Sequence, residues 1–314
     1  MFCGAVPIWP EYMEAGTSFP AARGGGGAVA SAETASTEVG LEILRTGGNA
    51  VDAAVAAAFA SFIAEIGVVH LGGSGIADIY DPREKRSLVY DFFSTTPGLG
   101  REDDDLAAID FRKVTVDFGA TTQDFHLGRA AVAVPGNISG LCLMAEDYGR
   151  LPLATLLEPA IQLARDGVAI AEFQAKTCEL LTPLYTHTAS MREIFLRNGR
   201  MIQAGERLTI PYLAETLMAL AEKGAALIRD GSLARAIVRD QEAHKGLLTA
   251  ADLENYRVKK LLSIHLPYRE FEIMLPPRSS TGGVLTAFTM KLLAHFNPSE
   301  MAHGSAAHLQ LLYE

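Results

Sequence analysis

The chain has 314 residues, 49% of them hydrophobic, and a formal net charge of −10. This length and composition allow a substantial buried core, and no apolar run reaches the roughly 18 to 20 residues that a membrane span needs. Because the chain is acidic and has no cluster of Lys and Arg, it lacks the character of a nucleic-acid-binding surface. We therefore expect no nucleic-acid partner and no membrane partner.

Residues 1–26 are expected to form an N-terminal lead before the folded part of the chain. This segment has no basic opening, and prolines interrupt its apolar residues, so it does not match a signal peptide. We expect a cytoplasmic protein. The cysteines Cys3, Cys142 and Cys178 are scattered and odd in number, which predicts neither a disulfide framework nor a metal set. Cys142 lies in an apolar helical context and is expected to be a small core residue.

Residues 35–80 predict two helices, a glycine-rich turn and a strand. Gly47 and Gly48 end the first helix, where a left-handed conformation is needed. Asn49 is expected to cap the second helix, with Asp52 in its first turn. The second helix is rich in alanine and is expected to be buried. The turn at residues 70–75 has too many glycines for a strand interior, so close packing of its backbone is favoured over a ligand site.

The rest of the chain alternates between strand and helix patterns. Strands are expected at 76–80 and 87–93, within 115–134, and at about 261–266 and 271–275. Helices are expected from Asn137 or Ser139 to 148, at about 153–165, 211–223 and 232–244, from Thr249, at 284–296 after Ser280 or Thr281, and at 306–314 after Ser305. Residues 27–314 are expected to form one compact α/β unit. The final helix has no glycine or basic last turn, which predicts an interrupted helix and a truncated domain.

A family resemblance enters at residues 40–60, which read GLEILRTGGNAVDAAVAAAFA, followed by LGGSGIADIYD at 71–81. These motifs resemble the large subunit of the gamma-glutamyltransferase family, one of the N-terminal nucleophile (Ntn) hydrolases. The resemblance continues, in the family's order and spacing, through 131–168, 205–224, 246–258 and 276–283.

The resemblance implies an α/β (α+β) fold with Ntn-hydrolase αββα layers, incomplete here because the small subunit is absent. It implies autoproteolytic processing of a precursor whose small-subunit portion is the partner of this chain. The nucleophile is then an N-terminal threonine outside these residues, with its own α-amino group as base. No cofactor is implied, and the substrate is expected to be a small amide or peptide.

One strand end departs from the family pattern. The family has an arginine followed by a glutamate in a D-x-R-E-x-x-P pattern, and the arginine holds the α-carboxylate of the γ-glutamyl donor. This chain has Phe93 in place of the arginine and Ser94 in place of the glutamate. Phe93 and Ser94 are therefore the predicted substrate-binding residues, and a phenyl ring cannot replace a charge-assisted contact with a carboxylate. We expect a donor without a carboxylate there, which makes glutathione metabolism doubtful; the alternative is that Arg101 or Arg112 supplies the charge.

No catalytic residue and no metal site is predicted within this chain. His295, His303 and His308 fit no zinc spacing and are expected on the surface or in loops. The acidic run at 102–105 is expected to be a solvated loop rather than a cation site. The alternative function is that of a non-catalytic, truncated or degenerate family member that acts as a structural or binding chain.

Overall fold

The computed structural model describes residues 25–102 and 108–314, so most of the acidic run at 102–105 lies outside the described residues. The chain divides into two compact units. Unit 1 takes in the described residues up to Gly73 and Ser94–Tyr256, and unit 2 takes in Ser74–Phe93 and Arg257–Glu314. The single domain expected over 27–314 stays a prediction. Within the described residues, no helix is both long and apolar enough to cross a membrane.

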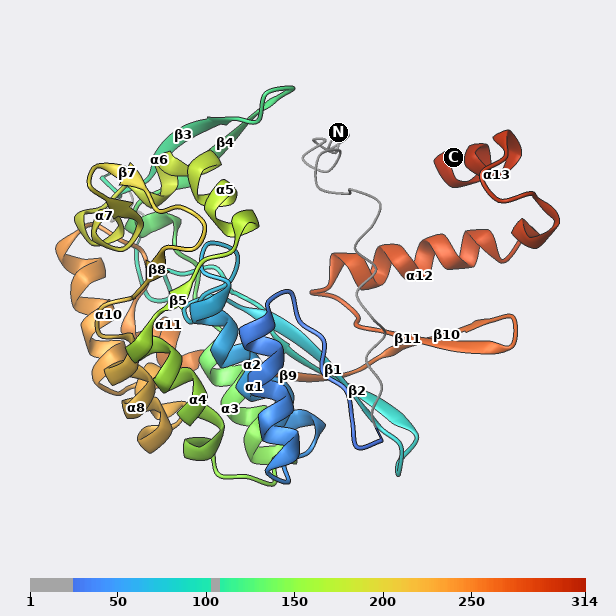
Figure 1. The fold of residues 1–314 in the computed structure, drawn as a ribbon, viewed down its shortest axis with the longest axis horizontal. Helices are drawn as coiled ribbons and strands as arrows, with labels where there is room; N and C mark the ends of the chain where they lie inside the picture. Colours follow the sequence, from blue (N-terminus) through green and yellow to red (C-terminus); the bar gives the residue numbers. More distant parts are fainter. Residues whose placement is uncertain (1–24, 103–107) are drawn as a thin grey trace. The chain divides into compact units, whose positions relative to one another are not determined.

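Helix α2 (Ala50–Ala64) is the centre of unit 1. It packs against α1 (Thr34–Arg45), α3 (Asn137–Tyr148) and α4 (Leu153–Asp166) (Figure 1). Its alanines let neighbouring helices approach on several faces, and its larger side chains, such as Val55 and Phe59, are completely buried. Burial of one such side chain stabilises the fold by about 1.5–3 kcal/mol. The predicted buried helix is confirmed.

The joint between α1 and α2 also forms as predicted. Gly47 adopts φ +97°, in the region that favours glycine. The side chain of Asn49 accepts hydrogen bonds from the backbone N–H groups of Val51 and Asp52, and the Asp52 carboxylate accepts one from the Asn49 N–H at 2.8 Å. This reciprocal capping box satisfies N–H groups that the first turn of a helix leaves unpaired.

The rest of unit 1 adds further helices and a second core cluster. Helix α8 (Leu213–Lys223) packs on α4, and the second cluster is centred on Phe195, Ile202 and Leu208. The other helical elements are η2 (Arg129–Ala131), α5 (Glu172–Leu180), α6 (Thr182–Tyr185), α7 (Ala189–Phe195), α9 (Ala226–Arg229), α10 (Ser232–Ala243) and α11 (Ala250–Asn255). The strands pair as short antiparallel ladders: β3 (Arg112–Asp117) with β4 (Thr122–Leu127), β5 (Val168–Ala169) with β8 (Arg207–Leu208), and β6 (Leu196–Arg197) with β7 (Arg200–Met201).

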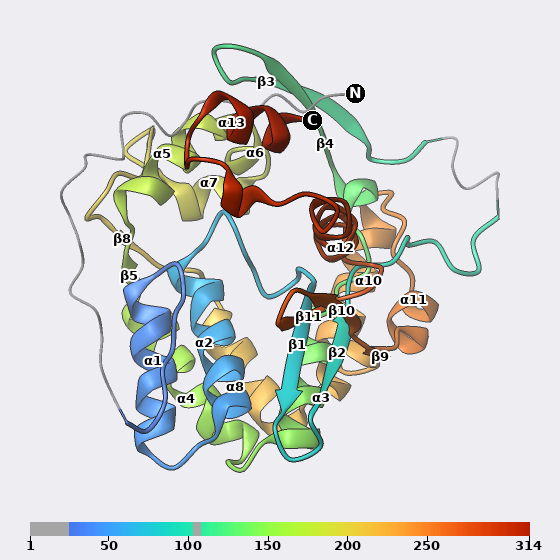
Figure 2. The ribbon, with the colours of Figure 1, turned by 90° about the vertical axis from the view of Figure 1, so that its right-hand side faces the viewer.

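Unit 2 is built on two antiparallel sheets. Strands β1 (Gly75–Asp81) and β2 (Arg86–Phe92) form the predicted hairpin, and β9 (Lys259–Leu262) pairs with the other edge of β2. The hairpin strands lie side by side in Figures 1 and 2. Strands β10 (Ile264–Tyr268) and β11 (Phe271–Leu275) form a second hairpin, which α12 (Thr281–Leu293) contacts. The unit ends with η3 (Pro298–Glu300) and α13 (Ala306–Tyr313).

Some boundaries differ from the sequence predictions. Neither Asn137 nor Ser139 caps α3: the N–H groups of Gly136 and Asn137 both donate to the Gly73 carbonyl, at 2.9 and 3.0 Å, and no side chain caps the helix. The strand expected at 261–266 is interrupted at Ser263, because β9 pairs with β2 and β10 pairs with β11. The alternating segment within 115–134 turns back as the β3–β4 hairpin and ends in η2.

Candidate functional site

The predicted substrate-binding residues follow the end of the central strand of unit 2. Strand β2 lies between β1 and β9, and Val89 to Phe92 are all buried. Phe93 is the first residue after this strand, and its side chain is 49% exposed. The burial pattern therefore changes abruptly at Phe93, the first predicted site residue. Ser94 comes next and is half-buried.

The carboxylate of Asp91 organises this strand end. One of its oxygens accepts the backbone N–H of Phe93 at 3.0 Å, and the other accepts the hydroxyl of Ser279 at 3.0 Å. Asp91 is itself only 5% exposed, and a buried carboxylate requires such partners. The loop 276–280, which the sequence marked only as part of the family resemblance, is thereby fixed beside Phe93. Sequence reasoning missed this contact because Asp91 and Ser279 are 188 positions apart.

Basic side chains of β9 lie beside the same part of β2. Lys259 is the register partner of Asp91, and Lys260 is the partner of Tyr90. The Lys260 ammonium lies over the Tyr90 ring, 5.6 Å from its centroid, which is a favourable cation–π geometry. Directly opposed side chains of neighbouring strands share one face of a sheet. Lys259 therefore places positive charge on the same face as the buried Asp91 carboxylate.

The segment after Ser94 is held within unit 1 at successive points. Thr95 forms a bridge to Val134. The Asp252 carboxylate accepts the N–H groups of Gly98 and Leu99 at 2.8 and 3.0 Å. Asp252 also forms a capping box with Thr249, the residue from which α11 was predicted to start. One buried carboxylate therefore both starts a helix and fixes the loop that leads away from the predicted site residues.

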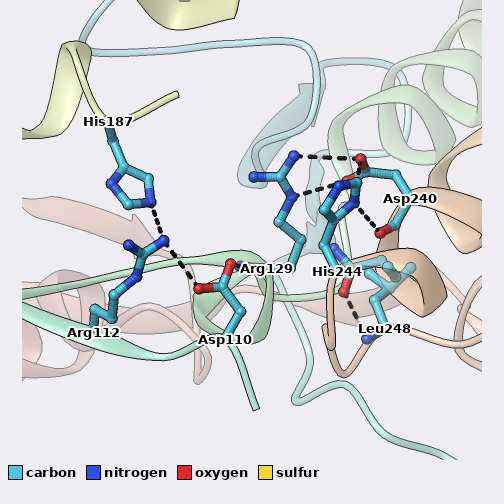
Figure 3. Close-up of polar contacts among 8 residues, drawn as sticks. Asp110, Arg112, Arg129, His187, Asp240, His244 and Leu248 are labelled. Carbon is cyan, nitrogen blue, oxygen red and sulfur yellow. Dashed lines mark hydrogen bonds and ion pairs between the residues drawn. The ribbon is translucent and has the colours of Figure 1, made fainter. Parts of the chain in front are cut away.

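The two arginines named as alternatives to Phe93 each have partners within unit 1. Arg101 donates to the Gly246 carbonyl at 2.7 Å. Arg112 forms an ion pair with Asp110 at 3.1 Å and contacts His187 (Figure 3). The pKa of Asp110 is lowered, first by the N–H of Arg129 and further by the charge of Arg112. A role for either arginine in the substrate site stays a prediction.

The second ionic cluster in Figure 3 is also internal to unit 1. The guanidinium of Arg129 donates to both carboxylate oxygens of Asp240, at 3.0 and 3.3 Å. This fork geometry lowers the pKa of Asp240. It joins η2 to α10 and is a structural contact.

The glycine-rich turn packs closely, as expected. The Gly73 N–H donates to the His70 carbonyl at 3.0 Å, and the Asn137 side-chain amide donates to the same carbonyl at 2.9 Å. A Cβ atom on Gly73 would lie 3.0 Å from the Asn137 amide nitrogen. A Cβ atom on Gly75 would lie 2.7 Å from the Phe92 ring. A side chain at Gly75 would therefore collide with the Phe92 ring, and one at Gly73 would require the Asn137 amide to shift.

Among residues 25–102 and 108–314, no group of three or more His, Cys, Asp or Glu side chains is arranged to hold a metal ion. His295 and His303 are exposed, as expected for surface histidines. His308 is half-buried, and its ring nitrogen Nδ1 lies 3.1 Å from the Gly304 N–H. Cys142 is buried, as predicted.

Known proteins resemble this chain over most of its length. The sequence model of the family Gamma-glutamyltranspeptidase matches residues 36–314. The Acylase ACY 1 proenzyme of a Pseudomonas species is 32% identical over 93% of this chain and 52% of its own length. The Glutathione hydrolase proenzyme of Escherichia coli is 30% identical over 92% of this chain and 48% of its own. The chain thus spans about half the length of these curated relatives.

The solved structures agree with the sequence matches. The gamma-glutamyltranspeptidase of Helicobacter pylori superposes with a TM-score of 0.80 at 26% identity, over 94% of this chain and 82% of that chain. The cephalosporin acylase of Bacillus halodurans superposes with a TM-score of 0.73 at 25% identity, over 88% of this chain and 50% of that chain. The predicted mixed helix-and-strand fold of the Ntn-hydrolase type is confirmed. On this combined agreement of sequence and fold, the chain belongs to the gamma-glutamyltranspeptidase family.

Proposed function

We propose that this chain is the large-subunit portion of a gamma-glutamyltransferase-like amide hydrolase or acyltransferase. The nucleophile is an N-terminal threonine outside these residues, and its partner chain is the small-subunit portion of the same precursor. One observation supports this proposal: the chain spans about half the length of relatives that are named proenzymes.

The acyl donor is a small amide or peptide without a carboxylate facing Phe93. The observation that carries this is the exposed phenyl ring at the end of β2, where the family pattern has an arginine. A donor carboxylate placed against this ring would lose water without gaining the bidentate arginine contact of the family pattern. The penalty for such an uncompensated buried charge is several kcal/mol, even after relaxation, and each ~1.4 kcal/mol corresponds to tenfold in kcat/KM.

The test uses the full-length gene product and its Phe93→Arg variant, with and without Ser94→Glu. N-terminal sequencing of any released small chain identifies its first residue. The kcat/KM values are then compared on γ-glutamyl-p-nitroanilide and on butyryl-p-nitroanilide, which lacks the carboxylate. We expect a threonine at the new N-terminus, a wild-type preference for the butyryl donor by orders of magnitude, and a shift toward the γ-glutamyl donor in the variant.

The possible outcomes separate the parts of this proposal. A wild-type preference for the γ-glutamyl donor would show that another residue supplies the charge and that the interpretation of Phe93 is wrong. Absence of both cleavage and turnover on a panel of simple amides would instead favour the non-catalytic alternative.

A further inference from the structure

A groove runs between helices α1 and α4 of unit 1. Both helices pack against α2 (Figures 1 and 2), and the groove between them has a volume of about 520 Å³. Along α1 its lining extends from Ala35 to Thr46, which corresponds to about 17 Å at ~1.5 Å per residue. The groove is therefore as long as about three turns of an α-helix.

The buried part of the groove is apolar. Val39 and Ile43 of α1 are 6% and 2% exposed. Pro159 and Leu163 of α4 are half-buried. Pro159 lies inside α4 and has no N–H to donate to the carbonyl of Thr155, which also lines the groove. A helix laid between α1 and α4 would cover these apolar side chains, as in the helix-in-groove mode of peptide recognition.

Three carboxylates make the groove acidic. Glu38, Glu42 and Glu158 line it and are exposed, and within the described part of the chain none of them forms an ion pair. Glu38 and Glu42 are four residues apart on α1, a spacing at which like charges on a helix repel each other. No Lys or Arg of residues 25–102 and 108–314 lines the groove. A positively charged partner would relieve this repulsion, because it brings the cations that the groove lacks.

We propose that the α1–α4 groove is a docking site for a basic amphipathic helix of a partner protein. Apolar side chains of that helix, at positions i, i+3, i+4 and i+7, lie over Val39, Ile43 and Leu163, and its Lys or Arg side chains pair with the three glutamates. A second copy of this chain does not supply such a helix: α12 and α13, whose apolar side chains are strongly exposed, contain Lys291 as their only Lys or Arg. The interaction goes beyond the proposed amide chemistry and does not depend on it.

The experiment measures the binding of synthetic helical peptides to the full-length gene product by fluorescence anisotropy. The probe has leucine at helical spacing and lysine elsewhere, over about four turns, and a second peptide has glutamate in place of lysine. We expect the lysine peptide to bind more tightly than the glutamate peptide and to lose affinity as salt is added. The variant Glu38→Gln/Glu42→Gln/Glu158→Gln should bind the lysine peptide about 3- to 100-fold more weakly, the range for three exposed ion pairs. Leu163→Ser should also weaken this binding, because it removes apolar contact.

The charge-matched control removes three carboxylates elsewhere in unit 1. Glu215 and Glu222 on α8 and Glu242 on α10 are exposed and do not line the groove. Glu215→Gln/Glu222→Gln/Glu242→Gln lowers the negative charge by the same amount and should leave the Kd of the lysine peptide unchanged. Equal binding of the two peptides to the wild type, or an equal loss of affinity in the groove variant and the control variant, would overturn the inference.

Reversal of the groove charge gives a second readout. Glu38→Lys/Glu42→Lys/Glu158→Lys should bind the glutamate peptide in preference to the lysine peptide, and circular dichroism melts establish that each variant is folded. If this triple variant does not fold, Glu158→Lys alone should shift the preference in the same direction by a smaller factor. An unchanged preference would contradict the inference. Self-association of the wild type without peptide, seen by sedimentation and abolished in the glutamine variant of the groove, would overturn the partner helix in favour of a second copy of the chain.

Discussion

Three buried carboxylates each join distant parts of the sequence in this protein. Asp52 is fully buried and accepts the Arg150 N–H at 3.1 Å in addition to its capping contact. Asp252 holds Gly98 and Leu99, and Asp91 holds Ser279. The helix starts at Asn49 and Thr249 were predicted from capping patterns, since a helix cap is defined by spacing. The local contact of Asp91 with the Phe93 N–H was not predicted. The long-range contacts were not predicted either, because a single sequence contains no signal for partners about 100 to 190 positions away.

The first residue-scale prediction concerns Asp252. Asp252→Ala should lower the free energy of unfolding by about 3 kcal/mol, because it leaves several N–H groups in the α11 cap and the 98–99 loop without an acceptor. Asp252→Asn retains one acceptor oxygen and should cost less. Urea unfolding of the full-length gene product measures both effects. Glu222→Ala, an exposed carboxylate on α8, is the control, and an Asp252→Ala midpoint equal to that of Glu222→Ala would contradict the prediction.

The second residue-scale prediction concerns the two buried thiols. Burial raises the pKa of Cys142 to about 12 and that of Cys178 to about 11. At pH 8 less than about one in a thousand of these side chains is the reactive thiolate. N-ethylmaleimide should therefore leave both unlabelled in the native protein and label both after denaturation, as read by peptide mass mapping. Labelling of native Cys142 within minutes at pH 8 would contradict this.

The same shifts set the direction of a pH effect on stability. In the unfolded chain these thiols lose their protons near the ordinary pKa of about 8.5, whereas in the folded protein they keep them to about 12 and 11. The contribution of the two thiols to the free energy of unfolding is fully present below about pH 8.5. It is lost as the pH rises through their pKa values in the folded protein.

At the scale of elements, helix starts that depend on a nearby side chain were predicted correctly. Starts and boundaries that depend on contacts between distant residues were not. The caps at Asn49, Thr249 and Ser305 formed as predicted, and Ser280 caps α12 as one of the two predicted alternatives. Each of these caps depends on a side chain and an N–H group two or three residues away. Helix α3 has no such cap, since the Gly73 carbonyl takes its place. Likewise, the sequence reads as one strand at 261–266. Only the different pairing partners, β2 for β9 and β11 for β10, divide it into two strands.

Helix α12 carries a prediction of its own. Val284, Leu285, Phe288, Leu292 and Phe296, on the helix and just after it, are each 43–61% exposed, while Gly283 and Ala287 are buried. A continuous apolar patch of this kind is typical of an interaction surface. The isolated chain of residues 1–314 should therefore bind anilinonaphthalene sulfonate and aggregate, and Phe288→Ser should reduce both. Phe173→Ser, at a 52% exposed aromatic on α5, is the matched control. A monodisperse chain without dye binding would contradict the prediction.

At the scale of the whole molecule, the fold class was predictable because long motifs recur in the family's order and spacing. Hydrophobic periodicity alone predicted which segments form helices and strands, but not how these elements pack or pair. The division into two units was not predicted, since unit 2 joins Ser74–Phe93 to a segment that begins only at Arg257. The expected cytoplasmic location stays a prediction.

The whole-molecule prediction is that residues 1–314 alone have no amidase activity. The proposed mechanism needs a threonine whose own α-amino group accepts its proton, and it places that threonine in the portion of the precursor beyond these residues. Donor-site residues alone can bind an acyl group, but binding without a nucleophile gives no acyl-enzyme. The purified chain is assayed on γ-glutamyl-p-nitroanilide and butyryl-p-nitroanilide, beside the full-length gene product purified in the same way. The isolated chain should match the buffer blank on every substrate. Turnover that follows the chain through further purification and disappears on denaturation would place a nucleophile within these residues. That result would refute the proposal that the nucleophile lies outside them.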